Sequence, residues 1–267
     1  MSIESSVADR RFTVDRQALI ASLRAVLPEQ ALLVEEEEMR PYECDGLTAY
    51  RQLPLIVALP ADEAQVQAIV KVCHALKVPV VARGAATGLS GGATPHRDGV
   101  VVSLAKLKKI ISVDPVSRTA VVQPGVRNLS VSEAAAPYAL YYAPDPSSQI
   151  ACTIGGNVAE NAGGVHCLKY GLTVHNVMRV RGLTIDGEIV EFGNAALDAP
   201  GYDLLALMNG SEGLLAVITE VTVRLTPKPE LAQVVIASFG DVRQAGDAVA
   251  SIIAAGIIPA GLEMMDR

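Results

Sequence analysis

Apolar residues recur with helical spacing near the start of the chain. Residues 13–27 carry Leu19, Ile20 and Leu23 at positions that share one face of a helix, which predicts an amphipathic helix. The glutamates at 35–38 are typical of a solvated helix face rather than of a metal site. We therefore expect a helical N-terminal extension over residues 1–50.

The next segment alternates between short apolar runs and helical periodicity. Residues 55–59 and 78–81 are short and apolar, as expected of buried strands. Between them, Asp62 precedes a run with an apolar residue at every third or fourth position, which predicts a capped helix. This β-α-β pattern predicts two parallel strands joined by a right-handed crossover.

From residue 100 onward the pattern becomes rich in strands joined by short turns. We expect strands at 100–104, 110–113, 119–123, 180–185, 188–192 and 217–225. Asp186-Gly187 is a favourable two-residue hairpin turn between two of them. The predicted fold class is α+β, with a small parallel β-α-β unit beside a larger mixed or antiparallel sheet.

Pro227 and Pro229 interrupt this pattern and mark a boundary. Beyond them we expect a strand at 231–238, a helix at 241–254 and a strand at 260–265. These elements predict the start of a further α/β unit, in a chain truncated before the unit is complete. Its helix would have an apolar face without a partner.

Composition and charge narrow the possible classes of protein. The 267 residues carry a net charge of −7 without a dense Lys/Arg cluster, which argues against nucleic-acid binding. The charged first twenty residues do not fit a signal peptide, and no apolar run approaches the roughly 20 residues of a membrane span. Four widely separated cysteines indicate reduced thiols in a cytoplasmic protein, with no zinc site.

A glycine-rich segment follows directly on the strand at 78–81. It comprises Arg83, Gly84, Ala85, Ala86, Thr87, Gly88, Leu89, Ser90, Gly91 and Gly92. Glycines permit positive φ, and successive backbone N–H groups can then form an anion-binding nest, to which Arg83 would add charge and Thr87 and Ser90 hydroxyl donors. The spacing matches neither Walker A nor the GxGxxG fingerprint. A plain glycine-rich turn is the structural alternative.

A second segment combines two Gly-Gly pairs with neutral polar side chains. Its candidate binding residues are Pro144, Asp145, Ser147, Thr153, Gly155, Gly156, Asn157, Asn161, Gly163 and Gly164. Asn157 and Asn161 would share a face of a helical turn. Bare backbone, amides, hydroxyls and one carboxylate suit a ligand that has both a phosphate and a flat heterocycle.

A third segment is a glycine-bounded turn that leads into a β-rich run. It contributes Glu212, Gly213, Val217 and Ile218, and taken alone it fits an ordinary loop and core strand equally well.

Together the three segments resemble the FAD-binding PCMH-type domain of the vanillyl-alcohol oxidase flavoprotein family. Within it they are most similar to the branch that contains D-lactate dehydrogenase, D-2-hydroxyglutarate dehydrogenase and the flavin-carrying subunit of glycolate oxidase, as are residues 40–47 and 166–171. The resemblance implies an FAD-binding domain of two α/β subdomains over residues 51–229 and the start of a cap domain over 230–267. It assigns 83–92 to the pyrophosphate, 144–164 to the isoalloxazine and ribityl groups, and 210–219 to the adenine side.

The resemblance also implies an activity. Relatives of this kind oxidise a small 2-hydroxy acid by hydride transfer from its α-carbon to flavin N5, and glycolate oxidases of this type contain partner subunits. Some members attach FAD through a loop histidine, but Ala86 and Thr87 occupy that stretch here, so we expect noncovalent FAD.

Catalytic and metal-binding residues of the family would lie beyond Arg267, so no catalytic residue is assigned. We expect His166, Lys169 and His175 to be structural or surface residues. The alternatives are an FAD-binding electron-transfer module, an inactive truncated fragment, or a transferase with the same fold.

Overall fold

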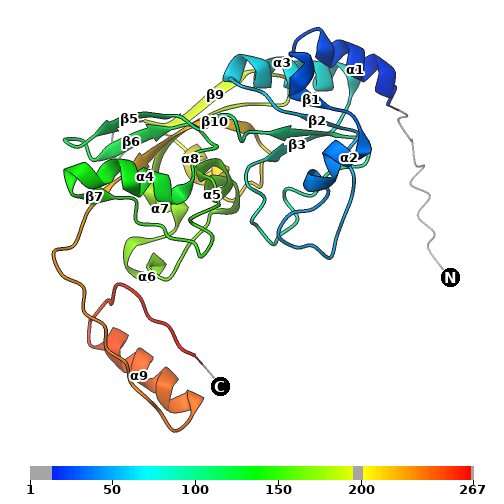
Figure 1. The fold of residues 1–267 in the computed structure, drawn as a ribbon. Coiled ribbons are helices and arrows are strands. Elements are labelled where there is room, and N and C mark those ends of the chain that lie inside the picture. Colours follow the sequence, from blue (N-terminus) through cyan, green and yellow to red (C-terminus); the bar gives the residue numbers. More distant parts are fainter. Residues whose placement is uncertain (1–13, 195–200, 266–267) are drawn as a thin grey trace.

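Two β-sheets form the centre of the structure, and helices cover them (Figure 1). The structure is a computed structural model that describes residues 14–194 and 201–265. A four-stranded sheet and a five-stranded sheet each carry their own helices, and a further helix near the C-terminus lies apart from both. This arrangement agrees with the predicted α+β class.

The four-stranded sheet has the order β1-β2-β4-β3. Its strands are β1 (Leu32–Leu33), β2 (Ile56–Ala58), β3 (Val80–Arg83) and β4 (Val100–Ser103). β2 and β3 both pair with β4 in parallel, and α3 (Glu63–Leu76) connects them after the Asp62 cap. The β-α-β unit is confirmed. β4 lies between its two strands and is buried along its whole length.

Helices on both faces bury this sheet. α1 (Arg16–Arg24) and α3 contribute Leu19, Leu23 and Ile69 to a core shared with Ile56 and Val100, all of which are inaccessible to solvent. On the opposite face, the short helix α2 (Glu36–Met39) buries Met39 and leaves its glutamates exposed. The helix predicted near residues 13–27 and the solvated glutamate face are both confirmed.

The five-stranded sheet has the order β5-β6-β10-β8-β9 and is antiparallel throughout. Its strands are β5 (Ile110–Asp114), β6 (Thr119–Val122), β8 (Val177–Leu183), β9 (Ile189–Gly193) and β10 (Val217–Arg224). Gly187, at a φ of +79°, donates its N–H to the Thr184 carbonyl in the turn between β8 and β9. The six strands predicted from residue 100 onward are therefore all present, with β4 in the other sheet.

Short elements cover the second sheet. They are α4 (Asn128–Ala135), α5 (Ile154–Glu160), α6 (Cys167–Tyr170), α7 (Thr173–Asn176), α8 (Leu204–Met208) and the small pair β7 (Leu140–Tyr141) and β11 (Thr226–Pro227). Three 3-10 turns lie at Glu29–Ala31, Arg40–Tyr42 and Ala136–Tyr138. Buried side chains of α4, α5 and α8 form the core over β6, β8 and β10.

The two sheets are joined by shared packing and by an ion pair. Leu183 of β8 and Val217 of β10 are buried in the core of the four-stranded sheet. The carboxylate of Glu63, at the start of α3, accepts hydrogen bonds from Nε and Nη2 of Arg181 at 2.9 Å each. It also accepts one from the hydroxyl of Thr219 at 2.6 Å. The bonds from Arg181 lower the pKa of Glu63.

The segment beyond Pro229 differs from its prediction. Helix α9 (Val242–Ala254) is present and capped by Asp241, but no strand forms at 231–238 or 260–265. Val234 and Ile236 are about nine-tenths exposed, and none of the α9 residues is buried. The apolar pattern there predicted strands, yet in the described part of the chain no strand lies beside it to complete a β-ladder.

Two further findings concern the cysteines and the length of the helices. All four cysteines are free thiols. Within residues 14–194 and 201–265, no helix has the length and apolar character needed to cross a membrane.

Candidate functional site

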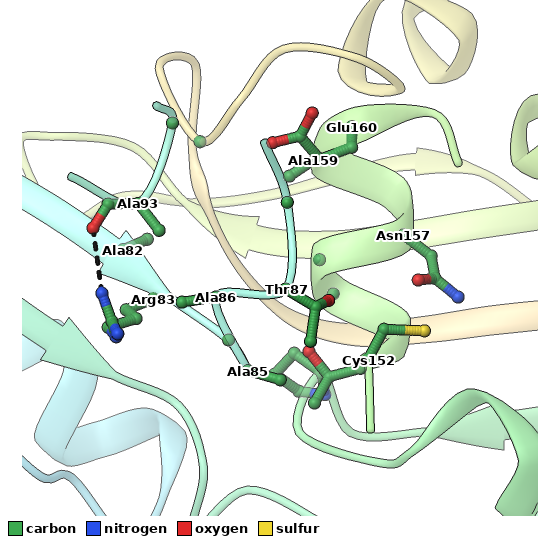
Figure 2. Close-up of a pocket in the computed structure, with 18 of the residues that line it drawn as sticks. Ala82, Arg83, Ala85, Ala86, Thr87, Ala93, Cys152, Asn157, Ala159 and Glu160 are labelled. Carbon is green, nitrogen blue, oxygen red and sulfur yellow. Dashed lines mark hydrogen bonds between the residues drawn. The ribbon is translucent and has the colours of Figure 1, made fainter. Parts of the chain in front are cut away.

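A pocket lies where the loop after β3, the start of α5 and the start of β10 meet (Figure 2). The three sequence segments singled out above are thus brought together from both sheets. The predicted binding residues that line it are Arg83, Gly84, Ala85, Ala86, Thr87, Gly88, Thr153, Gly155, Gly156, Asn157, Glu212, Gly213 and Ile218. Each of the three segments alone is weak evidence for a binding site, but in the structure they line one pocket.

Other predicted residues do not line the pocket. These are Leu89, Ser90, Pro144, Asp145, Ser147, Asn161, Gly163, Gly164 and Val217. Asn161 ends α5 at a φ of +49°, and its side chain accepts a hydrogen bond from the N–H of Val174 at 3.0 Å. Of the two asparagines expected to share a face, only Asn157 reaches the pocket, because the helix stops before Asn161.

The lining also includes residues that were not among the individual candidates, although most of them lie within the segments 83–92, 144–164 and 210–219. They are Asp45, Ala82, Gly92, Ala93, Leu104, Pro124, Pro146, Ser148, Cys152, Ala159, Glu160, Ala162 and Ala216. Glu160 lies three residues after Asn157 on α5, so helical spacing was a usable signal for it. Asp45 comes from a distant segment, and no local pattern links it to the site.

The glycine loop lies directly against the start of α5. A Cβ atom placed on Gly84 would come within 2.5 Å of Thr153 Oγ1, so a larger residue here would force the loop or the Thr153 side chain to shift. Ala86 and Gly91 have positive φ values of 54° and 83°, and the N–H of Gly91 donates to Asp45 Oδ2 at 2.9 Å.

Buried polar atoms in the pocket remain available for a ligand. Thr153 and Asn157 are 7% and 2% exposed, and neither Thr153 Oγ1 nor Asn157 Nδ2 has a hydrogen-bond partner among the described residues. Because buried polar groups are normally paired, these two atoms fit a site completed by a bound polar molecule. The pocket is partly open to solvent, and its volume of about 190 Å³ is smaller than the roughly 300–1,000 Å³ of a typical ligand pocket. A dinucleotide would therefore lie partly in the open cleft.

Arg83 is buried, but its guanidinium is not directed at the pocket's polar atoms. It donates hydrogen bonds to the carbonyls of Pro41, Tyr42 and Ala93 at 3.2–3.4 Å and lies over the Tyr42 ring. Figure 2 shows it directed away from Asn157 and Cys152. Burial lowers the pKa of Arg83. In this conformation its role is to hold neighbouring loops, and the expected contribution of charge to a phosphate is not seen.

The pocket is acidic instead. Asp45, Glu160 and Glu212 all line it. The Glu160 carboxylate lies close to Gly88, and the Glu212 carboxylate lies close to Gly92. Burial raises the pKa of Glu160, a hydrogen bond with Ser90 opposes this, and the charges of Glu212 and Asp45 raise it further.

The other polar residues near the second segment make contacts of their own. His166 Nδ1 lies 2.6 Å from Asp145 Oδ2, Lys169 Nζ lies over the Tyr170 ring, and His175 Nδ1 accepts a hydrogen bond from the N–H of Leu172. None of the three lines the pocket. Among the residues that the structure places, no cluster of three or more His, Cys, Asp or Glu has an arrangement suited to a metal ion.

Comparison with protein families gives two matches along the chain. The family described as FAD binding domain matches residues 54–193, and the C-terminal domain of FAD linked oxidases matches residues 228–267. The first match contains most of the pocket, including the glycine loop and α5.

Curated relatives share substantial sequence with the chain. Glycolate oxidase subunit GlcD of Escherichia coli (strain K12) is 62% identical over 95% of this chain and 51% of its own length. The Bacillus subtilis (strain 168) protein of the same name is 40% identical over 85% and 48%. D-lactate dehydrogenase of Anaerostipes hadrus is 34% identical over 93% and 52%. The chain spans about half the length of these relatives.

A solved structure has the same fold. Alkyldihydroxyacetonephosphate synthase aligns with a TM-score of 0.79 and 21% identity, over 92% of this chain and 47% of that one. At this identity, the likeness bears on the fold alone.

Proposed function

Since the chain belongs to the FAD binding domain family, we propose that it is the FAD-binding part of an oxidoreductase acting on small 2-hydroxy acids of the glycolate or D-lactate class. FAD is the cofactor of this family. The observation that carries the proposal is the pocket in which three glycine-rich segments converge around the unpartnered atoms of Thr153 and Asn157. The substrate class is supported by the names of the relatives.

Within the site, each segment has a proposed role. Backbone N–H groups of residues 84–92, other than that of Gly91, which binds Asp45, would bind the pyrophosphate. Residues 144–164 would hold the isoalloxazine and ribityl groups, and residues 210–219 would border the adenine side. Thr153 Oγ1 and Asn157 Nδ2 would hydrogen-bond to the cofactor. Bound FAD would supply the hydride acceptor for oxidation of a 2-hydroxy acid. The residues described above would bind and orient it.

We also propose the domain organisation expected from the sequence. Residues 1–50 would be an N-terminal extension, 51–229 the FAD-binding domain and 230–267 the start of a cap domain, consistent with the two family matches. Partner subunits are supported by relatives that are named as subunits. A reducing, cytoplasmic location is supported by the four free thiols.

Purified protein should carry FAD that is released on denaturation. The glycine loop has Ala86 and Thr87 where a covalent histidine link would form, so acid precipitation should leave the flavin in the supernatant. Absorbance near the oxidised-flavin bands, measured in both fractions, checks this. Flavin that remains in the washed pellet would contradict noncovalent binding.

One observation favours a second candidate, an FAD-binding module without a substrate site. Among the described lining residues, Arg83 is the one cationic side chain, and it is bound to carbonyls. No free cation of the pocket is therefore available to anchor a carboxylate. Anaerobic addition of glycolate or D-lactate to the FAD-loaded chain separates the two functions, because bleaching of the flavin supports the oxidoreductase and an unchanged spectrum supports the module.

FAD affinity should increase as the pH falls through the titration of Glu160. The pKa of Glu160 is already raised above its ordinary value of 4.5, and a bound pyrophosphate would raise it further by repulsion. The complex therefore takes up protons, so affinity is highest below the pKa of the free protein and falls as the pH rises through the pKa of the complex.

The matched variants for this experiment are Glu160→Gln and Glu188→Gln. Glu188 is exposed on the turn before β9. Fluorescence titration with FAD from pH 5 to 8 should show a flatter profile for E160Q and the wild-type profile for E188Q. An unchanged profile in E160Q would exclude Glu160 as the source of the pH dependence.

A further inference from the structure

A segment outside the matched FAD-binding range packs on the glycine loop. Residues 40–52, here called the brace segment, precede the family match that begins at residue 54. The segment is held together by Glu43, whose side chain pairs with Arg51 at 2.8 Å and whose backbone carbonyl accepts the N–H of Gln52 at 2.8 Å. It therefore forms a defined structure beside the pocket.

Asp45 connects this segment to the loop. Its side chain is 6% exposed, and its two oxygens accept different backbone N–H groups. Oδ1 accepts from Leu47 at 2.8 Å within the brace segment, and Oδ2 accepts from Gly91 at 2.9 Å in the glycine loop. Gly91 has a φ of +83°, so the carboxylate fixes the loop at a residue whose conformation favours glycine.

Further contacts join the same two segments. The N–H of Gly46 donates to the carbonyl of Gly88 at 2.9 Å, and a Cβ on Gly46 would come within 2.8 Å of that oxygen. From the other direction, Arg83 donates to the carbonyls of Pro41 and Tyr42. The loop is thus tied to the brace segment near its beginning, middle and end.

We propose that the brace segment holds the glycine loop in its ligand-binding conformation, and that Asp45 is a positioning residue for the pyrophosphate site. The inference rests on the proposed function for its ligand. The carboxylate lies among acidic neighbours, and both of its oxygens already bind backbone N–H groups. Its contribution is to order the loop, so that the cofactor meets backbone donors already in place.

The test compares Asp45→Ala with the matched control Asp62→Ala. Asp62 caps α3 in the same subdomain and likewise accepts a backbone N–H, that of Gln65 at 2.8 Å, but it is not part of the pocket lining. Hydrogen–deuterium exchange of the FAD-free chain reports the order of residues 84–93. Fluorescence titration with FAD reports affinity, and thermal melting reports stability.

In D45A, exchange of the 84–93 amides should accelerate about tenfold or more, and FAD affinity should fall by about 10–100-fold, because a charge-assisted hydrogen bond is lost. D62A should lower the melting temperature and leave both loop exchange and FAD affinity at the wild-type level. Asp45→Asn keeps one acceptor oxygen and should give an intermediate result. It serves as the test if D45A does not fold.

Each failure has its own signature. Wild-type loop exchange in D45A or D45N overturns the brace whether or not FAD binds. Accelerated exchange with unchanged FAD affinity overturns the positioning role. A wild-type chain that binds no FAD contradicts the proposed function, and the exchange comparison then still decides whether Asp45 orders the loop.

Discussion

Replacing Gly84 by valine should lower the affinity for FAD by roughly 100-fold, which corresponds to about 2.7 kcal/mol. The first added carbon alone would lie 2.5 Å from Thr153 Oγ1, well inside van der Waals contact. Either the loop or the Thr153 side chain would have to shift, and both movements separate the proposed pyrophosphate donors from the hydroxyl of Thr153. Equilibrium titration of the flavin-free protein with FAD measures the loss.

A glycine in open space provides the control for this substitution. Gly246 lies in α9, and a Cβ placed there meets no atom within 4 Å. Gly246→Val should therefore bind FAD as the unchanged protein does, while Gly84→Ala should fall between wild type and G84V. If G84V retains wild-type affinity, the contact between the loop and α5 is not needed for cofactor binding.

Truncating Leu183 to alanine should lower the free energy of unfolding by about 2–5 kcal/mol, the usual cost of removing a large apolar side chain from a core. Leu183 belongs to β8 of the five-stranded sheet, yet it is completely buried in the core of the four-stranded sheet. The cavity left by the truncation would lie where the two sheets join. Urea denaturation followed by circular dichroism gives the change.

The neighbouring hairpin supplies a matched position. Ile185 follows two residues later and is 54% exposed, so Ile185→Ala should change the free energy of unfolding by less than about 0.5 kcal/mol. Equal losses for the two variants would show that the packing of Leu183 does not join the two sheets.

Local sequence patterns were sufficient for most of the framework. The periodicity of α3 with its Asp62 cap, and the Asp186-Gly187 turn, are properties of neighbouring residues, and both are present in the structure. The strands expected at 231–238 and 260–265 did not form, since a strand also requires a neighbour for its backbone groups. Apolar periodicity indicates which secondary structure a segment can adopt, but it does not indicate which strand would pair with it.

For the pocket, too, local sequence patterns did not reveal contacts between residues that are distant in the sequence. Glycine spacing identified the loop at 84–88 and the start of α5, because clusters of glycine can be recognised directly in the sequence. Asp45 was missed because its connection to Gly91 spans 46 positions. Arg83 was found, but the direction of its guanidinium depends on carbonyls of residues 41 and 42, which a sequence pattern cannot place.

The acidic lining of the pocket has a consequence for how an anionic cofactor arrives. A protein with a net charge of −7 and three carboxylates lining its pocket offers no long-range attraction to a pyrophosphate. Encounter would then proceed without electrostatic steering, and added salt would screen a repulsion rather than an attraction. Recognition would then depend on contact with the backbone donors. Selectivity would reside in the shape of the loop, and loading would be no faster than unassisted diffusion allows.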